Sequence, residues 1–460
     1  MKSQNKNMLQ GPLFWNIILY TIPIILTSVL QLLFNAADLV VVGRFCGSVS
    51  VAAVGATGSI TNLIVNLFIG LSVGAGVTVA HALGAREEEA VHRTVHTALP
   101  AALVCGVLVT VIGVAFSETF LRWMGTPENV LPLSALYMKI YFGGITFTMV
   151  YNFCASILRA AGDTKSPLIF LSIAGAINVV LNVFFVTVLD MNVAGVALAT
   201  VISQGVSAVL VVIVLMRRND ECKLHLSKLR FHRAQLVKMI RIGLPAGIQS
   251  SLFSISNVMI QSSINSFGDV LMSGNAASAN IEGFVYVALN AFHQTAVNFI
   301  GQNVGAHQYK RVCKTLWICL GCVVVVGLGL GLGAYALGPQ LLSIYITDSA
   351  EAIAYGVVRL TYVCIPYFLC GLMDVSTGAL RGMGESVAPM IISVLGVCGI
   401  RIGWIATIFQ IPQFHTPQSL YLSYAVSWTV TFLIQLAVFF RAYRRYVSGK
   451  MYEHEIAEAS

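Results

Sequence analysis

The sequence predicts an all-α protein that crosses a membrane many times and consists of two copies of one unit. Of its 460 residues, 57% are hydrophobic and 10% are charged, whereas charged residues make up about a quarter of typical soluble domains. Uncharged stretches such as 171–189 and 316–337 are long enough for a helix to cross the hydrocarbon layer of a bilayer. The motif LRAAGDTKSP at 158–167 returns as LRGMGESVAP at 380–389, which indicates a duplicated helical bundle.

Twelve apolar segments are each predicted to form a membrane-spanning helix. They begin near residues 14, 51, 94, 131, 166, 193, 236, 272, 315, 353, 387 and 418, at boundaries marked by charged residues, glycine or proline. Four bases, Arg44, Arg122, Lys139 and Arg359, fall on the side opposite both termini, and Arg401 falls within a span, so the other 22 of the 27 lysines and arginines share one side. The positive-inside rule then predicts a multi-pass protein of the cell membrane with both termini in the cytoplasm.

The repeat divides the chain into two lobes of six spans each. Pro23 and Pro245, like the two copies of the motif, are separated by 222 positions. We expect an N-lobe at 1–217, a cytoplasmic linker at 218–233, a C-lobe at 234–445 and a cytoplasmic tail at 446–460. Because six is an even number, the two lobes would run in the same direction and be related by a pseudo-twofold axis along the membrane normal.

Features that suggest other functions lack the context that those functions need. The net charge of +8 comes from bases spread over short loops and tails, so no nucleic-acid partner is expected. The glycine-rich stretch 327–333 lacks the ending of a phosphate-binding loop, and Cys319 and Cys322 lack a second pair of ligands at zinc spacing. Glu282 and His293 have no nucleophile or metal motif beside them. We therefore expect no cofactor, no enzyme activity, and a monomer in the lipid bilayer.

Asp38 is the strongest candidate for a functional residue within a span. Gln31, Asn35 and Asp38 share one face of the first span and form a polar stripe that should face protein or water instead of lipid. Burial disfavours a charged carboxylate, so such a group can exchange a proton near neutral pH or hold a small cation, for example sodium, with neighbouring oxygens. Asn178 and Asn182, one turn apart on the fifth span, are candidate partners. The alternative is that both amides only join one helix to another.

The second copy carries a similar stripe without an acid. Asn257, on the seventh span, is interpreted as standing where the first copy has its aspartate. Glu282 and Tyr286 lie one turn apart on the eighth span, and we expect them to line a substrate cavity with Asn257, Gln31 and Asn35. Glu282 is either a second site for a proton or cation, or a carboxylate neutralised by a neighbour.

Arg401 is the one base that the sequence places inside a span. A guanidinium there needs a compensating group, and either Asp374 or Glu282 could supply a negative charge. We interpret Arg401 and Asp374 as a structural ion pair or a gate.

The chain resembles the multidrug and toxic compound extrusion (MATE) family. The resemblance rests on the motif repeated after the fourth and tenth spans, on Pro23 and Asp38 in the first span, and on Asn178 and Asn182 in the fifth. It implies a V-shaped pair of six-helix bundles that exports organic cations and other amphipathic small molecules by alternating access. The export would be driven by an inward flow of protons or sodium ions.

The resemblance also assigns roles to individual residues. Asp38 matches the family's essential first-span aspartate, and Asn178 matches the asparagine that accompanies it, whereas Asn182 stands where many prokaryotic members have a second aspartate. Members with a sodium site in the C-lobe use a seventh-span glutamate, and this chain has Ser254 and Asn257 in that region. The alternative function is that of a lipid-linked-precursor flippase, a group similar in fold that more often lines its cavity with bases.

Overall fold

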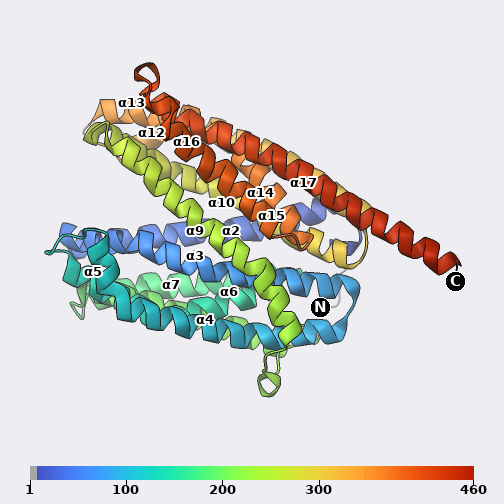
Figure 1. Ribbon diagram of the computed structural model, residues 1–460. Helices are drawn as coiled ribbons and strands as arrows, with labels where there is room; N and C mark the ends of the chain where they lie inside the picture. Colours follow the sequence, from blue (N-terminus) through green and yellow to red (C-terminus); the bar gives the residue numbers. More distant parts are fainter. Residues whose placement is uncertain (1–7, 348, 460) are drawn as a thin grey trace. The chain divides into compact units, whose positions relative to one another are not determined.

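The computed structural model describes residues 8–347 and 349–459, and every regular element within them is a helix (Figure 1). Nine of these helices are long and apolar enough to span a membrane, and the bent pair α5 (Leu131–Gly143) and α6 (Ile145–Ala160) forms a tenth span. The helices α9 (Arg233–Asn265) and α10 (Asp269–Gly305) have the length of a span but a more polar sequence, and they complete the predicted twelve. The prediction of an all-α, multi-pass membrane protein is confirmed.

The described chain divides into two compact units, and unit 1 comprises residues 22–251. Its core is built from large apolar side chains, among which Phe142 and Phe153 are fully buried. Besides parts of α9 and of α2 (Leu13–Phe45), unit 1 contains α3 (Ser48–Ala85), α4 (Glu88–Trp123), α5, α6, α7 (Lys165–Thr187), α8 (Asn192–Arg217) and the short 3-10 helix η1 (Leu226–Lys228).

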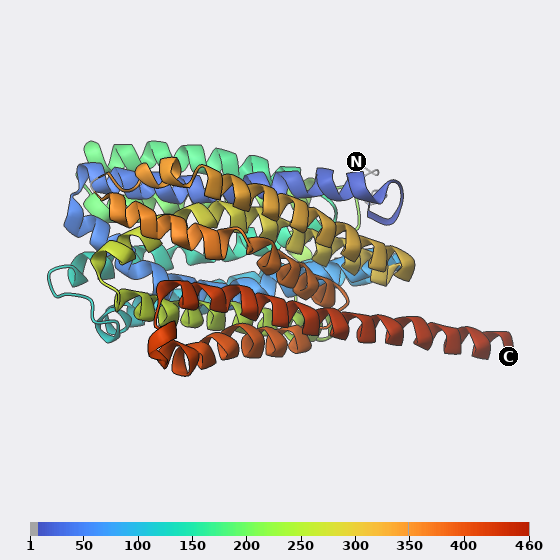
Figure 2. The same ribbon diagram turned by 90° about the horizontal axis from the view of Figure 1, so that it is seen from above.

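Unit 2 comprises residues 8–21 and 252–459, with α10 in its interior. Most of α10 is buried, because it packs against α11, α13 and α14. Figure 2 shows α17 as one continuous helix. The elements after α10 are α11 (Tyr309–Ala336), α12 (Gly338–Ser343), α13 (Ala350–Arg359), the π-helix η2 (Leu360–Cys364), α14 (Tyr367–Gly382), α15 (Val387–Ser393), the π-helix η3 (Val394–Gly399), α16 (Ile400–Ala406), the 3-10 helices η4 (Ile408–Gln410) and η5 (Pro412–Phe414), and α17 (Pro417–Ala459).

The two units differ from the predicted lobes at two places. Residues 8–21 belong to unit 2 and residues 234–251 belong to unit 1, so α2 and α9 are each divided between the units. The first part of α2 is attached to α10 of unit 2: the hydroxyl groups of Thr21 and Thr295 are 2.8 Å apart, and Tyr20 packs edge-on against Phe299. Apolar periodicity predicts a continuous helix correctly but contains no information about which bundle each part of it contacts.

The first part of α9 lies against α3 at glycines on both helices. A Cβ added to Gly74 would lie 2.1 Å from Met239 O, and one added to Gly70 would lie 2.2 Å from Gly247 N. Only a residue without a side chain allows two helix backbones to approach this closely. These glycines therefore explain why the start of α9 packs with unit 1.

The repeated motif forms the same turn in both units. Gly162 and Gly384 have φ angles of +89° and +87°, which glycine adopts without the strain that a Cβ causes. After the first of these turns, Asp163 accepts hydrogen bonds from the backbone N–H of Ser166 at 3.0 Å and from its hydroxyl at 2.6 Å. The motif therefore ends one helix and starts the next, and its function is architectural.

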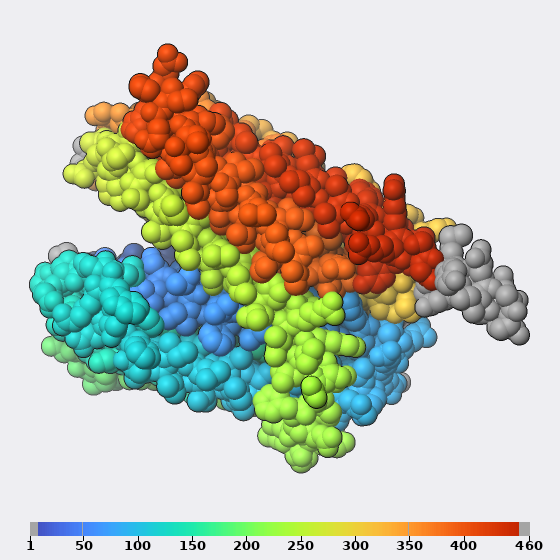
Figure 3. Space-filling model, viewed as in Figure 1, coloured from blue at the N-terminus to red at the C-terminus, as the bar shows by residue number. Residues whose placement is uncertain are grey.

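The predicted linker packs against the N-terminal part of α4. The backbone N–H groups of His225 and His232 donate hydrogen bonds to His96 Nε2 at 3.0 Å and to Thr97 Oγ1 at 3.1 Å. Figure 3 shows the linker in light green as a compact knob beside the start of α9. The segment at 218–232 is therefore an ordered part of unit 1.

Candidate functional site

Asp38 on α2 is held by uncharged side chains from α7 and α8. The side-chain amide of Asn182 donates one hydrogen bond to Asp38 Oδ1 and a second to Asn178 Oδ1 at 3.2 Å. Asn178 donates in turn to Thr200 Oγ1 at 3.4 Å, and Thr200 is also within hydrogen-bonding reach of the Asp38 carboxylate. The structure therefore brings the three predicted residues together, and we call them, with Thr200, the Asp38 cluster.

Thr200 is the member of this cluster that the sequence did not reveal. A single threonine in an apolar span usually bonds to a carbonyl of its own helix, and the Thr200 hydroxyl does donate to Val196 O at 3.0 Å. The hydroxyl oxygen remains free to accept the bond from Asn178. Only the packing of α7 against α8 identifies this second role.

The Asp38 cluster is rich in oxygen atoms, and no base in the described part of the chain pairs with its carboxylate. Asn178 and Asn182 are buried, and Asp38 is half-buried. Among the ion pairs of the described residues, none includes Asp38. Asn182 Oδ1 is buried without a hydrogen-bond donor, and leaving a buried acceptor in this state costs about 1–3 kcal/mol. A proton on the carboxylate, or a small hard cation between these oxygens, suits such a site.

Three residues predicted to line a substrate cavity have exposed polar side chains. Gln31 and Asn35 lie on α2 within unit 1, and Asn257 lies on the part of α9 that belongs to unit 2. Their exposure agrees with the predicted polar stripes. Their contact with a substrate stays a prediction.

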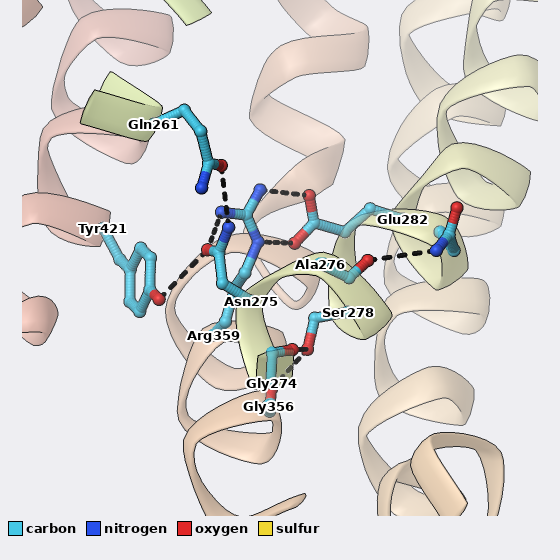
Figure 4. A network of polar contacts seen from close by, with 10 residues as sticks. Gln261, Gly274, Asn275, Ala276, Ser278, Glu282, Gly356, Arg359 and Tyr421 are labelled. Atoms are coloured by element: carbon cyan, nitrogen blue, oxygen red, sulfur yellow. Dashed lines mark hydrogen bonds and ion pairs between the residues drawn. The ribbon is translucent and has the colours of Figure 1, made fainter. Parts of the chain in front are cut away.

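Glu282 forms a buried ion pair with Arg359 inside unit 2 (Figure 4). Arg359 Nε donates to Glu282 Oε1 at 2.7 Å and Arg359 Nη2 donates to Oε2 at 2.9 Å, so the contact is bidentate. Both side chains are less than 9% exposed. Of the two alternatives for Glu282, neutralisation by a neighbour is therefore right. Arg359 ends α13 and is buried within the bundle.

Further polar groups complete the surroundings of Arg359. Arg359 Nη1 donates to Asn275 Oδ1, which also accepts a hydrogen bond from the Tyr421 hydroxyl at 3.2 Å. Asn275 Nδ2 donates to Gln261 Oε1 at 3.1 Å (Figure 4). These bonds satisfy the buried groups around the ion pair, as a low-dielectric interior requires.

Arg401 is buried in unit 2, and no carboxylate of the described residues forms an ion pair with it. Its Nε donates to Ser427 Oγ at 3.1 Å and its Nη1 donates to Asn257 Oδ1 at 3.4 Å. The guanidinium carbon lies 4.1 Å from the ring centroid of Tyr424 and 5.6 Å from that of Trp428. The predicted ion pair is wrong: Arg359 occupies Glu282, and the π-helix η3, just before Arg401, changes the direction in which the following side chains point.

Asp374 and the two further candidates on α10, His293 and Tyr286, have other neighbours within unit 2. The base whose charge acts on Asp374 is Arg381. His293 Nδ1 donates to the backbone carbonyl of Asp374 at 2.6 Å, which makes His293 a structural residue. Tyr286 is 40% exposed and packs edge-on against Tyr367. The cavity role of Tyr286 stays a prediction.

The correspondence between the two copies also needs a correction. At the 222-residue offset of Pro23 and Pro245, Asn257 stands opposite Asn35, and the position opposite Asp38 is Ile260. Ile260 is 1% exposed and belongs to the apolar core of unit 2. Unit 2 therefore replaces the acid with a core side chain, and not with an amide as the sequence suggested.

These features define a class of protein: a multi-pass helical membrane protein built from two related bundles, with a carboxylate in the first that pairs with no base of the described residues. The MatE family model matches residues 23–184 and again residues 245–405, so the chain belongs to this family of multidrug and toxic compound extrusion transporters. One match falls in each half, which agrees with the internal repeat.

Relatives with full-length similarity agree with this assignment. The chain is 27% identical over 392 residues to the probable multidrug resistance protein YoeA of Bacillus subtilis, covering 84% of both chains. It is 20% identical to the multidrug export protein MepA of Staphylococcus aureus, covering 84% of this chain and 85% of that one. The chain is therefore a MATE-family efflux transporter, a family that acts on small molecules.

Solved structures show the same fold. A MOP superfamily transporter from Pyrococcus furiosus superimposes with a TM-score of 0.89 at 20% identity, covering 97% of this chain and 98% of that one. The MATE transporter VcmN of Vibrio cholerae in its bent form superimposes with a TM-score of 0.86 at 20% identity, covering 94% and 98%. The similarity confirms the two-lobe, twelve-helix architecture.

Proposed function

We propose that this chain is a secondary active exporter that exchanges organic cations and amphipathic compounds for protons or sodium ions at the Asp38 cluster. The coupling ion enters this site as a transported substrate. The observation that carries the proposal is the half-buried carboxylate of Asp38, which has no basic partner among the described residues and lies beside a buried, donor-free oxygen of Asn182.

Exchange requires that the ion and the exported compound oppose each other in binding. In alternating access, Asp38 binds the ion from outside as the compound leaves, and binding of the next compound from inside favours release of the ion. A negative coupling of about 1–3 kcal/mol between the two ligands is typical of such linkage. One carboxylate can supply this coupling, because its charge differs between the ion-bound and ion-free states.

Efflux from proteoliposomes tests this proposal. A fluorescent organic cation is loaded, and pH and sodium gradients are imposed separately on vesicles that contain the full-length chain or its Asp38→Asn variant. The variant keeps the size of the side chain and loses its charge, so we expect normal folding and efflux at the rate of protein-free vesicles. Gradient-driven efflux by Asp38→Asn at the rate of the unaltered chain would refute the proposal.

Asp190→Asn provides a matched control in the same unit. Asp190 is exposed and has a φ angle of +52°, a conformation that asparagine adopts readily. The chemical change is the same as at Asp38 and the side chain lies outside the cluster. We expect this variant to transport normally, so that a loss confined to Asp38→Asn is a property of the site.

We also propose that the protein lies in the cell membrane with both termini in the cytoplasm. The bases of the linker support this orientation, because segments rich in lysine and arginine stay on the cytoplasmic side. A fluorescent protein fused after residue 460 should be bright, and an alkaline phosphatase fused there should be inactive. An active phosphatase fusion would reverse the orientation.

A further inference from the structure

Arg401 and its neighbours form a positively charged site within unit 2. We call Arg401, Asn257, Tyr424, Ser427 and Trp428 the Arg401 cluster. Arg401 is 4% exposed, and its two side-chain hydrogen bonds go to neutral acceptors, Ser427 and Asn257. A guanidinium has five N–H donors. Most of its donors are therefore not used by hydrogen bonds within the described part of the chain.

Another buried arginine of the same bundle, Arg359, shows what a structural arginine looks like here. Arg359 is neutralised by a bidentate bond to Glu282, and its third nitrogen bonds to Asn275. Among the ion pairs of the described residues, none joins Arg401 to Asp374 or to Glu282, and Glu282 is bound to Arg359. Burying an uncompensated charge is unfavourable, and in a membrane-spanning region such a group marks a functional position.

The aromatic rings of the cluster supply only part of the stabilisation that the buried positive charge of Arg401 needs. The guanidinium lies over Tyr424, and Trp428 packs edge-on against Tyr424 and Tyr367. Stacking of a cation on these rings is favourable but leaves its N–H groups free for an acceptor in the guanidinium plane. Both rings are buried in the apolar core of unit 2, so the surroundings of the charge are apolar, which suits a ligand with an aromatic body.

The cluster has one edge at the surface of its unit. Asn257 is exposed, whereas Arg401, which it contacts, is buried. The π-helix η3 (Val394–Gly399) ends just before Arg401, and π-helical turns occur often at functional sites. A ligand that binds at Asn257 is therefore one side chain away from the guanidinium.

We propose that the Arg401 cluster binds the carboxylate or sulfonate group of amphipathic aromatic anions, so that the exported compounds include organic anions as well as cations. The inference rests on the proposed export function and extends its substrate class. The anionic group accepts hydrogen bonds from the free N–H groups of Arg401, and the aromatic body packs against Trp428 and Tyr424.

Calorimetric titration of the purified full-length chain in detergent with 2-naphthoate tests the site. The neutral analogue 2-naphthamide has the same ring and no charge. We expect Arg401→Gln to weaken naphthoate binding at least tenfold and to leave naphthamide binding unchanged. Equal binding of the two ligands by the unaltered chain, or an equal loss of both in the variant, would overturn the inference.

Asn257→Asp keeps the test informative if Arg401→Gln fails to fold. This exposed change places a carboxylate at the atom that already contacts Arg401, so it should occupy the guanidinium and abolish naphthoate binding. Glycerol 1-phosphate, the charged part of an anionic lipid headgroup, is titrated in parallel and should bind more weakly than naphthoate. Tighter binding of glycerol phosphate would contradict the proposed aromatic substrate.

The test of the anion site and the test of the export proposal can fail independently of each other. Asp38→Asn should bind naphthoate as the unaltered chain does, although it transports nothing. If Arg401→Gln still binds naphthoate and the unaltered chain exports cations, the anion site is refuted and the export proposal stands. If the unaltered chain binds naphthoate selectively but neither gradient drives efflux, the anion site stands and the antiport proposal is refuted.

Discussion

Unit 1 and unit 2 share a helix order but hold charges of opposite sign within their bundles. In unit 1, Asp38 is surrounded by amides and a hydroxyl group. In unit 2, Glu282 is neutralised by Arg359, and the hydrogen bonds of Arg401 within the described residues go to the neutral Ser427 and Asn257. The turns and helices of the repeat have been kept, whereas the polar interior has diverged. Similar packing therefore does not imply similar binding.

The comparison also separates two kinds of buried acid. Asp38 forms no ion pair with a base of the described residues and lies beside a donor-free oxygen, whereas both oxygens of Glu282 accept bonds from Arg359. The first arrangement leaves the charge available for a ligand. The second uses the charge to hold α10 against α13.

The largest expected effect comes from breaking the ion pair between Glu282 and Arg359. Glu282→Gln leaves Arg359 buried without its anion and should destabilise the protein by about 3–5 kcal/mol. Asp38→Asn should change stability by less than about 1 kcal/mol, because Asp38 has no base to lose. Unfolding by SDS titration in mixed micelles measures both. Equal losses in the two variants would show that the two acids do not differ in role.

A smaller effect is expected where the first part of α9 meets α3. Gly74→Ala places a Cβ 2.1 Å from Met239 O, so the two helices must move apart, at a cost of about 1–3 kcal/mol. On the same helix, Gly55 has nothing within 4 Å of its Cβ position, and Gly55→Ala should stabilise by about 0.5–1 kcal/mol. A stable Gly74→Ala variant would show that α9 is not attached to unit 1 in this way.

The smallest effect is expected for the exposed ion pairs at the C-terminal end of α4. Arg122 contacts Glu118 at 3.1 Å and Glu128 at 2.9 Å, with all three side chains at least half exposed. Solvent screens such pairs and the side chains lose entropy in forming them. Arg122→Gln should leave the melting temperature unchanged. A loss as large as that of Glu282→Gln would mean that burial does not determine the strength of these pairs.

Much of the fold could be predicted because it depends on apolar length and on turn residues. The twelve predicted starts lie within about six residues of the observed helices. The Asp38 cluster could be predicted in part, since Asn178 and Asn182 are one turn apart on an ordinary α-helix. Regular helical spacing is the condition under which such reasoning works.

The polar network of unit 2 could not be predicted because its helices are irregular. The π-helix η2 follows Arg359 directly, and η3 ends just before Arg401. A spacing rule based on 3.6 residues per turn misdirects the side chains beyond such a turn by roughly 100°. Only the three-dimensional structure shows that Arg359 pairs with Glu282 and that Arg401 bonds to neutral groups among the described residues.

The division of α2 and α9 between the units has a consequence for biosynthesis. Residues 8–21 leave the ribosome first, but Tyr20 and Thr21 pack against Phe299 and Thr295, which are made more than 270 residues later. Unit 1, in turn, is complete only when the chain has reached Ser251. If the chain is divided within the linker, neither fragment contains a complete unit. Unit 1 then needs residues 234–251 from the second fragment, and unit 2 needs residues 8–21 from the first.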